Sequence, residues 1–364
     1  MLRSHAASYG STTPARTATV EEPRRGLTFS SEALVKHYDC AMLDLDGVVY
    51  VGGAAVPGVP QLLENARAQG MTLAYVTNNA SRTPQSVARH LTELGISAEA
   101  ADVVTSAQAA AREMAALVPA GSKVQVVGGE GLREALRERG LQPVSSADDE
   151  PSGVVQGFSP TIGWAALAEG GYVLQRGVPW VASNLDVTIP TARGIAPGNG
   201  TFVDVLAAVA SRRPDIVAGK PHRPLFDETV RRTSTQMPIV VGDRLDTDIL
   251  GAVTCGADSL LVMTGVTDLH ALCHADVGQR PNYVSWTLDG LMTSHACPQP
   301  AAGGGRHLGG WTVRVEGDVL VVAQQGGSID DGLRAVAMAA WDELGNHPDR
   351  RLDLSRLDQV WSSR

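Results

Sequence analysis

The chain has 364 residues, which is enough for two or three domains. Its 39 acidic residues outnumber 30 basic ones, and no basic stripe is present, so nucleic acid is not expected as a partner. No apolar run approaches the roughly 18 residues of a membrane span, and the four cysteines lack the spacing of a zinc site or a disulfide framework. These features predict a cytoplasmic metabolic enzyme, compatible with a homo-oligomer, that does not bind a membrane.

The first 30 residues are rich in Ser, Thr, Ala and Arg, and no acid precedes Glu21. They contain no apolar core, which argues against a secretory signal. An organellar transit peptide is the alternative, but no clear amphipathic helix follows. We therefore expect residues 1–30 to be a disordered tail.

The segment from Ala41 to Tyr50 is an apolar run that ends in two aspartates, Asp44 and Asp46, followed by Gly47. Alternate side chains of a strand point the same way, and the glycine allows the backbone to turn. Two adjacent carboxylates repel each other unless a hard cation such as Mg²⁺ lies between them. The pair therefore predicts phosphate chemistry with magnesium, and the alternative is a surface turn closed by an aspartate side chain.

A second apolar strand is predicted from Thr72, and it ends in Thr77, Asn78 and Asn79. These residues offer a hydroxyl and amide groups as neutral donors to an anion. The alternative is a loop cap.

Helices are predicted beside short Val-, Ile- and Leu-rich runs, at residues 60–70, 84–95, 225–232 and 246–256. This alternation is typical of a doubly wound parallel α/β sheet. Ligands of such sheets bind at the carboxyl ends of the strands, where Asp44, Thr77 and Asp243 are all predicted to lie.

The segment between about residues 117 and 217 reads as a second, smaller α/β unit. It contains Gly128, Gly129 and Gly131 between a predicted strand and a predicted helix. The glycine spacing of a dinucleotide fingerprint is incomplete, so a plain strand–helix turn is expected.

Two later segments carry further charged groups. Lys220 is one of only three lysines among 30 basic residues, which is compatible with a compact point charge on a phosphate or carboxylate. A predicted strand from Pro238 precedes Asp243, Asp246 and Asp248. Asp243 is placed to ligate a metal ion, and Asp248 could orient its neighbours.

Residues 294–306 are predicted to form a linker, and residues 307–364 a small ββα unit. Fewer than about 60 residues are marginal as an independent domain, so this unit should pack on the rest of the protein or on another subunit. A structural or regulatory appendage is expected, and a fragment of an acetyltransferase-like fold is the alternative.

The four clusters at residues 41–50, 72–79, 218–222 and 238–249 resemble, in order and in local sequence, the four motifs of the haloacid dehalogenase superfamily of phosphatases. The likeness covers roughly residues 38–291. It is closer to the branch with a large inserted cap, which includes nitrophenyl phosphate, phosphoglycolate, pyridoxal phosphate and glycerol 3-phosphate phosphatases. It implies a Rossmann-like catalytic core at 31–117 and 218–293 and an α/β cap at 118–217.

The resemblance also implies roles. Asp44 would be the nucleophile and Asp46 the general acid and base, while Thr77, Asn78, Asn79 and Lys220 would hold the phosphate. Mg²⁺ would be bound by Asp44, the backbone carbonyl of Asp46 and Asp243, with Asp248 positioning this set. The remaining expected substrate contacts come from a Pro- and Gly-rich cap loop whose polar side chains could instead be solvated, namely Asn184, Asp186 and Arg193.

The expected function is Mg²⁺-dependent hydrolysis of a small phosphomonoester, with glycerol 3-phosphate preferred because the cap loop is polar and poor in aromatic rings. Phosphoglycolate is the nearest alternative. A catalytically silent metabolite sensor signalling through the C-terminal unit is an alternative of another class, although it would not need both Asp44 and Asp46. A phosphotransferase would require an acceptor that the sequence does not identify.

Overall fold

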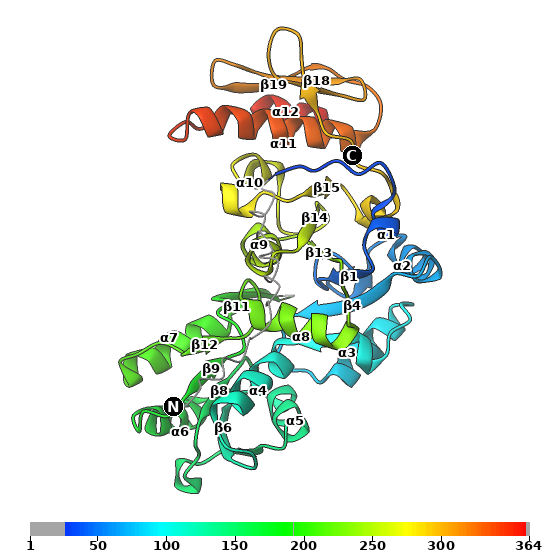
Figure 1. The fold of residues 1–364 in the computed structure, drawn as a ribbon. Coiled ribbons are helices and arrows are strands. Elements are labelled where there is room, and N and C mark those ends of the chain that lie inside the picture. The colour runs from blue at the N-terminus through cyan, green and yellow to red at the C-terminus, as the bar shows by residue number, and fades with distance from the viewer. Residues whose placement is uncertain (1–25, 192, 362–364) are drawn as a thin grey trace, which may run out of the picture.

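The computed structural model describes residues 26–191 and 193–361 and contains three main sheets (Figure 1). Most of the expected N-terminal tail, residues 1–25, lies outside the described part. Within the described residues, no helix is long and apolar enough to cross a membrane.

The first sheet is parallel and has six strands in the order β15-β14-β13-β1-β4-β5. Leu43, the last residue of β1, pairs with Tyr75 of β4 and Val241 of β13. The central strands therefore end side by side, and the loops that follow them meet at one edge. The strands are β1 (Cys40–Leu43), β4 (Thr72–Thr77), β5 (Val103–Thr105), β13 (Pro238–Gly242), β14 (Asp258–Val262) and β15 (Tyr283–Ser285).

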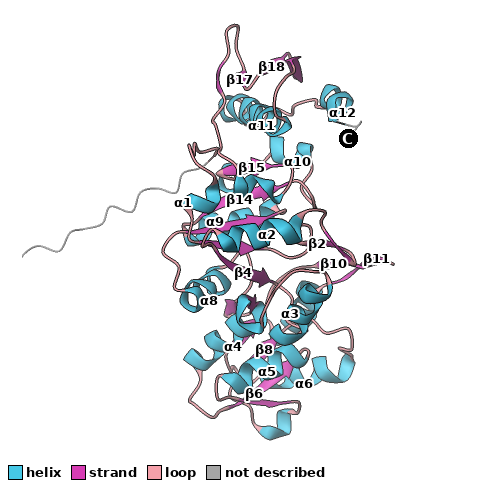
Figure 2. Cartoon of the chain, turned by 90° about the vertical axis from the view of Figure 1, so that its right-hand side faces the viewer, coloured by secondary structure: helices cyan, strands magenta, loops and turns pink. Residues whose placement is uncertain are grey.

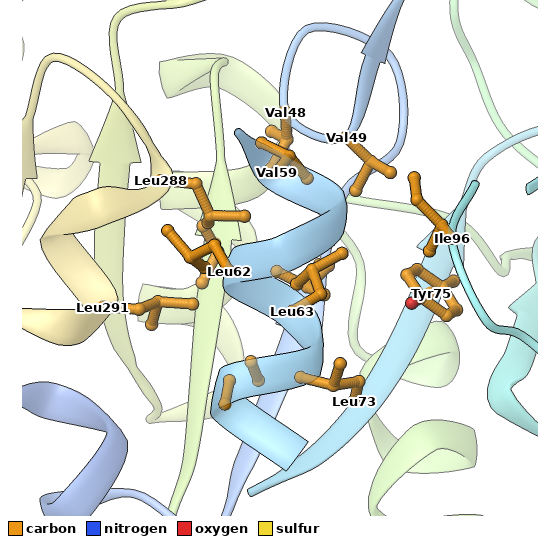
Figure 3. Close-up of a cluster of buried hydrophobic side chains, with 14 of the residues drawn as sticks. Val48, Val49, Val59, Leu62, Leu63, Leu73, Tyr75, Ile96, Leu288 and Leu291 are labelled. Atoms are coloured by element: carbon orange, nitrogen blue, oxygen red, sulfur yellow. The ribbon is translucent and has the colours of Figure 1, made fainter. Parts of the chain in front are cut away.

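Helices and short turns cover this sheet. Leu62 and Leu63 of α2 pack among apolar side chains that include Leu73 and Leu291 (Figure 3). The helices are α1 (Leu34–His37), α2 (Val59–Ala68), α3 (Pro84–Glu93), α9 (Leu250–Cys255) and α10 (Leu269–Cys273), with a small hairpin of β2 (Tyr50–Val51) and β3 (Ala54–Ala55). Short turns of 3-10 helix lie at Ala100–Asp102, Val277–Gln279 and Leu288–Met292, and a π-helical turn at Leu245–Ile249 precedes α9.

The second sheet is also parallel and has the order β12-β9-β8-β6-β7. Its strands are β6 (Lys123–Val127), β7 (Gln142–Val144), β8 (Val154–Gln156), β9 (Trp180–Ala182) and β12 (Ile216–Val217). Its other elements are α5 (Glu130–Glu138), a 3-10 turn (Ala147–Asp149), α6 (Trp164–Leu174), α7 (Asn199–Ala210) and the hairpin of β10 (Thr188–Thr191) and β11 (Gly194–Pro197).

Two helices, α4 (Ser106–Leu117) and α8 (Arg223–Thr233), lie between these sheets (Figures 1 and 2). The chain passes from β5 through α4 to β6, and returns from β12 through α8 to β13. Met42 of the first sheet, Val126 of the second and Phe226 of α8 belong to one buried apolar cluster. Burial of this shared surface holds the two sheets together.

The C-terminal unit is larger than the expected ββα arrangement. It is a four-stranded antiparallel sheet of β16 (Gln299–Pro300), β17 (Arg306–Leu308), β18 (Trp311–Glu316) and β19 (Val319–Gln324), with α11 (Ile329–Asn346) and α12 (Ser355–Trp361). The expected linker thus contains a strand, and glycines 303–305, all with positive φ, return the chain to β17. Two residues of strand are too few to produce a detectable alternation in the sequence.

Helix α11 fixes this unit to the first sheet. Asp330 accepts hydrogen bonds from the Ser285 hydroxyl (2.8 Å) and the Trp286 N–H (2.9 Å) at the end of β15. Trp341 donates to the carbonyl of Leu272 in α10 at 2.8 Å. The predicted doubly wound α/β fold with a second α/β unit is confirmed, and the C-terminal unit packs on the core as expected.

Candidate active site

A buried lysine joins two of the predicted site carboxylates. Lys220 lies between β12 and α8, and its Nζ is 2.5 Å from Oδ1 of Asp44 and 2.8 Å from Oδ1 of Asp248. It also donates to the carbonyl of Val76 at 3.3 Å. Burial disfavours the ammonium form, but Asp248 and Asp44 outweigh it and raise the pKa of Lys220. The ammonium therefore stays charged beside Asp44.

Asp243 follows β13 and is nearly fully buried. Its Oδ2 accepts a hydrogen bond from the Val266 N–H at 2.6 Å, whereas its Oδ1 has no partner among the described residues. Burial, with a contribution from Asp44, raises the pKa of Asp243 to about 6. An orphaned buried carboxylate oxygen of this kind is expected where a cation belongs.

The carboxylates of Asp44, Asp243 and Asp248 each place an oxygen within 4.8 Å of the others. Hard oxygen ligands at this spacing suit Mg²⁺. A Cβ atom on Gly47 or Gly265 would lie 2.5 or 1.9 Å from Oδ2 of Asp243, so both positions require glycine. The sequence predicted a turn at Gly47 but gave no signal for its contact with Asp243, and it gave none for Gly265.

Asp46 lies exposed at the mouth of the site, two residues beyond Asp44. Desolvation by the surrounding protein and the neighbouring Asp44 carboxylate raise the pKa of Asp46, against the opposing effects of Tyr50, Lys220 and Arg82. The Tyr50 hydroxyl donates to Oδ2 of Asp46 at 3.4 Å. Neither Tyr50 nor Arg82 was predicted: Tyr50 lies four residues after Asp46 in the same motif, whereas Arg82 is distant in the chain.

Asn78 connects three parts of the chain. Its Oδ1 accepts from the backbone N–H of Lys220 (2.8 Å), and its Nδ2 donates to the carbonyl of Lys220 (3.1 Å) and to Asp186 (3.2 Å). Its backbone carbonyl accepts from Asn184 and Ser106, both at 2.7 Å. The side chain thus positions the lysine loop instead of facing an anion as a free donor.

The neighbouring polar residues act locally. Oγ1 of the buried Thr77 accepts from the Asn79 N–H at 3.0 Å, which leaves its hydroxyl hydrogen available for another acceptor. Oδ1 of Asn79 accepts from the N–H and the hydroxyl of Ser81 at 2.9 and 2.8 Å. Asn79 therefore forms the loop cap that was the alternative interpretation of this motif.

The three polar residues of the loop before α7 are placed differently. Asn184 is buried against Asn78, and Asp186 accepts from Asn78 while burial raises the pKa of Asp186. Arg193 is exposed in the turn of the β10–β11 hairpin. A Cβ on Gly198 would lie 2.2 Å from the carbonyl oxygen of Asp186, and a Cβ on Gly200 would lie 2.3 Å from that of Leu185. These two glycines therefore allow the neighbouring backbone to approach closely, and they do not provide space for a ligand.

Arg244 is a further residue at this edge that the sequence analysis missed. It binds Asp246 through two hydrogen bonds of 3.1 and 2.8 Å, and its N–H donates to Oδ2 of Asp248 at 3.2 Å. Its positive charge also opposes the rise in the pKa of Asp186. Asp246 is thus engaged by an arginine and does not join the three clustered carboxylates.

The glycines of the predicted strand–helix turn at 128–131 have a packing role. A Cβ on Gly131 would lie 2.5 Å from the carbonyl oxygen of Ala80, and one on Gly129 would lie 3.2 Å from that of Ser81. The turn between β6 and α5 therefore packs directly on the loop that follows Asn78 and Asn79.

The comparisons with known proteins agree with this geometry. Residues 41–142 match the haloacid dehalogenase-like hydrolase family, and residues 217–291 match a second HAD-hydrolase-like family. Residues 308–354 match a GCN5-related N-acetyltransferase like domain, which was the alternative considered for the C-terminal unit. The chain belongs to the haloacid dehalogenase-like hydrolases.

The chain is 41% identical to the D-glycerol 3-phosphate phosphatase of Mycobacterium tuberculosis over 323 residues, covering 85% of this chain and 88% of that protein. It is 34% identical to an acid sugar phosphatase of Staphylococcus aureus, covering 67% and 93%. The crystal structure of glycerol phosphate phosphatase from Mycobacterium tuberculosis in complex with magnesium has a TM-score of 0.76 at 41% identity, covering 85% and 92%. The predicted resemblance to this capped branch is confirmed.

Proposed function

We propose that this protein hydrolyses a small phosphomonoester through an aspartyl-phosphate intermediate, with glycerol 3-phosphate as the preferred substrate. One observation supports the chemistry most directly. Asp44 and Asp46 stand at one strand end, with the Lys220 ammonium 2.5 Å from Asp44 and a raised pKa on Asp46. A carboxylate nucleophile, an acid beside it and a fixed cation are the groups that covalent phosphoryl transfer requires.

The residues at this edge fit a magnesium ion. Asp44 and Asp243 would hold it, together with the backbone carbonyl of Asp46, and the unpartnered Oδ1 of Asp243 supports this assignment. When bound, Mg²⁺ neutralises phosphate charge and allows the Asp44 carboxylate to approach it. Asp248 would fix Lys220, which is 2.8 Å away, and would thereby keep the phosphate side of the site in place.

In the first step, Oδ of Asp44 attacks phosphorus as the ester oxygen leaves. Asp46, whose raised pKa favours retention of its proton, gives that proton to the departing alkoxide. Lys220 and the Thr77 hydroxyl stabilise the oxygens of the transferring phosphoryl group, and Asn78 holds the loop that carries Lys220.

In the second step, water hydrolyses the aspartyl phosphate. The ionised Asp46 now removes a proton from that water and recovers the form in which the cycle began. Orthophosphate then leaves, and Asp44 is free again as a carboxylate.

We assign residues 31–117 and 218–293 to a catalytic core and residues 118–217 to a cap over the site. Support comes from Asp186, which lies between β9 of the second sheet and the separate β10–β11 hairpin, and which is bound by Asn78, the residue that follows β4 of the first sheet. In this assignment Asn184 positions the loop, while Asp186 and Arg193 would meet the substrate. The C-terminal unit, residues 307–364, would serve as a structural support, and we expect the enzyme to act in the cytoplasm, where it could form a homo-oligomer.

Asp186 also favours one substrate class. Its carboxylate, held close to the phosphate-binding groups, can accept hydrogen bonds from the hydroxyls of glycerol, but it would repel the carboxylate of phosphoglycolate. The relative from Mycobacterium tuberculosis, named D-glycerol 3-phosphate phosphatase, supports the same choice.

Phosphate release from a panel of small phosphomonoesters, with and without Mg²⁺, tests the proposal. We expect Mg²⁺-dependent turnover with the highest kcat/KM for glycerol 3-phosphate, and loss of turnover in Asp44→Asn. Faster turnover of phosphoglycolate would overturn the substrate assignment alone. Binding of these esters without phosphate release would favour the silent sensor.

A further inference from the structure

A cavity lies beside the helices that connect the two parallel sheets, apart from the candidate active site. Its volume is about 380 Å³, and residues of α3, α4, α5 and α8 line it. None of the residues lining it belongs to the candidate active site. A cavity of this size is in the range of small-molecule sites.

The lining is rich in charge. Its charged members are Arg112, Arg139, Arg231, Arg232, Glu138 and Glu228. The lining therefore has a net charge of plus two, whereas the whole chain has a net charge of minus nine. Such a concentration of arginines in an acidic protein favours an anionic ligand.

Glu228 organises three of these arginines. Its side chain is only 3% exposed, and its carboxylate is 2.7 Å from Arg139, 3.1 Å from Arg231 and 3.7 Å from Arg112. These arginines come from three places: Arg112 is on α4, Arg139 follows α5, and Arg231 is on α8 beside Glu228. The buried carboxylate thus brings guanidinium groups from both sheets' helices to one point.

One carboxylate cannot satisfy three guanidinium groups. Each guanidinium has five N–H donors, whereas a carboxylate offers about four lone-pair sites. The three arginine side chains remain between 34% and 40% exposed, so their remaining donors are open to the cavity or its mouth. Arg232 adds a fourth guanidinium to the lining, and no ion pair involves it among the described residues.

We propose that this cavity binds a small oxyanion with two or more negative charges on phosphate or carboxylate groups. Such a ligand would balance the surplus positive charge, and arginine forks match the oxygen geometry of both groups. Three alanines, a proline and two glutamines, Gln85 and Gln108, complete the lining, and the glutamine amides can donate further hydrogen bonds to the same oxygens.

The position of the cavity gives the ligand a mechanical role. Helices α4 and α8 are the two connections between the sheets (Figure 1), and α5 belongs to the second sheet. A polyanion bound to Arg112, Arg139 and Arg231 would bridge all three helices. Binding should therefore raise the temperature of unfolding.

Isothermal titration calorimetry of the full chain without Mg²⁺ tests the proposal, with inorganic pyrophosphate and citrate as probes. Arg232→Ala is the main variant, because Arg232 has no described ion pair whose loss would disturb the fold. This substitution should raise the Kd of the tighter-binding probe about tenfold, because one charge-assisted hydrogen bond contributes about that much to affinity. Arg139→Ala should weaken the same Kd at least as much.

Arg133→Ala is the matched control. Arg133 lies on α5 near Arg139, but its side chain donates to the Ser145 hydroxyl at 2.8 Å and does not line the cavity. It should bind both probes like the wild type. Equal affinity in wild type, Arg232→Ala and Arg139→Ala would place binding outside this cavity and overturn the proposal, as would absence of binding. Neither result bears on phosphoester hydrolysis.

Discussion

Nζ of Lys220 lies 2.8 Å from Oδ1 of Asp248, and both side chains are almost completely buried. A buried ammonium is stable only while its carboxylate partners remain. The contact joins the loop after the second sheet to the turn after β13. The lysine therefore depends on a residue that need not touch the substrate.

Asp248→Asn should lower kcat about 10- to 100-fold, since it removes the charge that holds Lys220 in place. Asp246→Asn is the control on the same turn, because Asp246 is exposed and pairs with Arg244. Steady-state kinetics of both variants would show whether kcat falls in Asp248→Asn alone. Equal losses in the two variants would contradict a special role for the Lys220–Asp248 contact.

Asn78→Ala should lower kcat about 10- to 100-fold by releasing the lysine loop, and it should also destabilise the fold by about 1–3 kcal/mol through unpaired buried groups. Asn79→Ala, which removes only the cap to Ser81, should have a much smaller effect on kcat. Kinetics and urea unfolding of the pair measure this. If Asn79→Ala proved the more damaging for kcat, Asn79 and not Asn78 would serve the reaction.

Asp46→Asn should separate the two proposed steps. Nitrophenolate leaves without a proton, so p-nitrophenyl phosphate should still phosphorylate Asp44 and release a burst of about one nitrophenolate per site. Hydrolysis of the intermediate lacks its base, so steady turnover should fall about 10²- to 10⁴-fold. Rapid-mixing absorbance would show the burst. If the steady-state rate of Asp46→Asn equalled that of the wild type, Asp46 would not be the base.

Mg²⁺ should stabilise the fold as well as activate the enzyme, because Asp44, Asp243 and Asp248 are crowded carboxylates. At 100 times its Kd, the ion should add about 2.7 kcal/mol to the free energy of unfolding. Thermal unfolding with Mg²⁺ or with EDTA measures this. In Asp243→Asn the stabilisation at the same Mg²⁺ concentration should be much smaller, and an unchanged value would remove Asp243 from the ion site.

His295 should make the fold sensitive to acid. Burial, with a contribution from Arg334, lowers the pKa of His295 to about 4 from 6.5. Between pH 4 and 6.5, His295 is protonated in the unfolded chain but neutral in the folded protein. The free energy of unfolding therefore keeps the full contribution of His295 above about pH 6.5 and decreases as the pH drops toward 4. The loss should be on the order of 3 kcal/mol.

Urea unfolding at several pH values tests this expectation. His295→Gln keeps a donor for the carbonyl of Gly290, which lies 2.8 Å from Nε2 of His295, but does not titrate. Its stability should depend less on pH in this window than that of the wild type. Identical slopes for the two proteins would exclude His295 as the source.

The strand ends could be predicted because their polar residues interrupt apolar runs. Asp44 and Asp243 each follow a buried strand and Thr77 ends one, and parallel strands bring such ends together. The contact between Lys220 and Asp44 was harder to predict from the sequence, because the two residues are 176 positions apart. Only the motif resemblance suggested it.

Other features could not be foreseen from local sequence. Asn78 was expected to donate to an anion, but the partners of its side chain, Asp186 and Lys220, are more than 100 positions away, which no spacing rule records. The strand at Gln299–Pro300 is too short to leave a pattern. The Glu228 cluster was missed because arginines on different helices are near one another only after the sheets have packed.

Helix α11 binds Ser285 and Trp286 at β15, the outermost strand of the six-stranded sheet. An outer strand with open N–H and C=O groups is a template for pairing with strands of other chains. The C-terminal unit therefore lies against an edge at which the six-stranded sheet could otherwise pair with another chain. Covering this edge is a role for the acetyltransferase-like unit that would require no acetyl transfer.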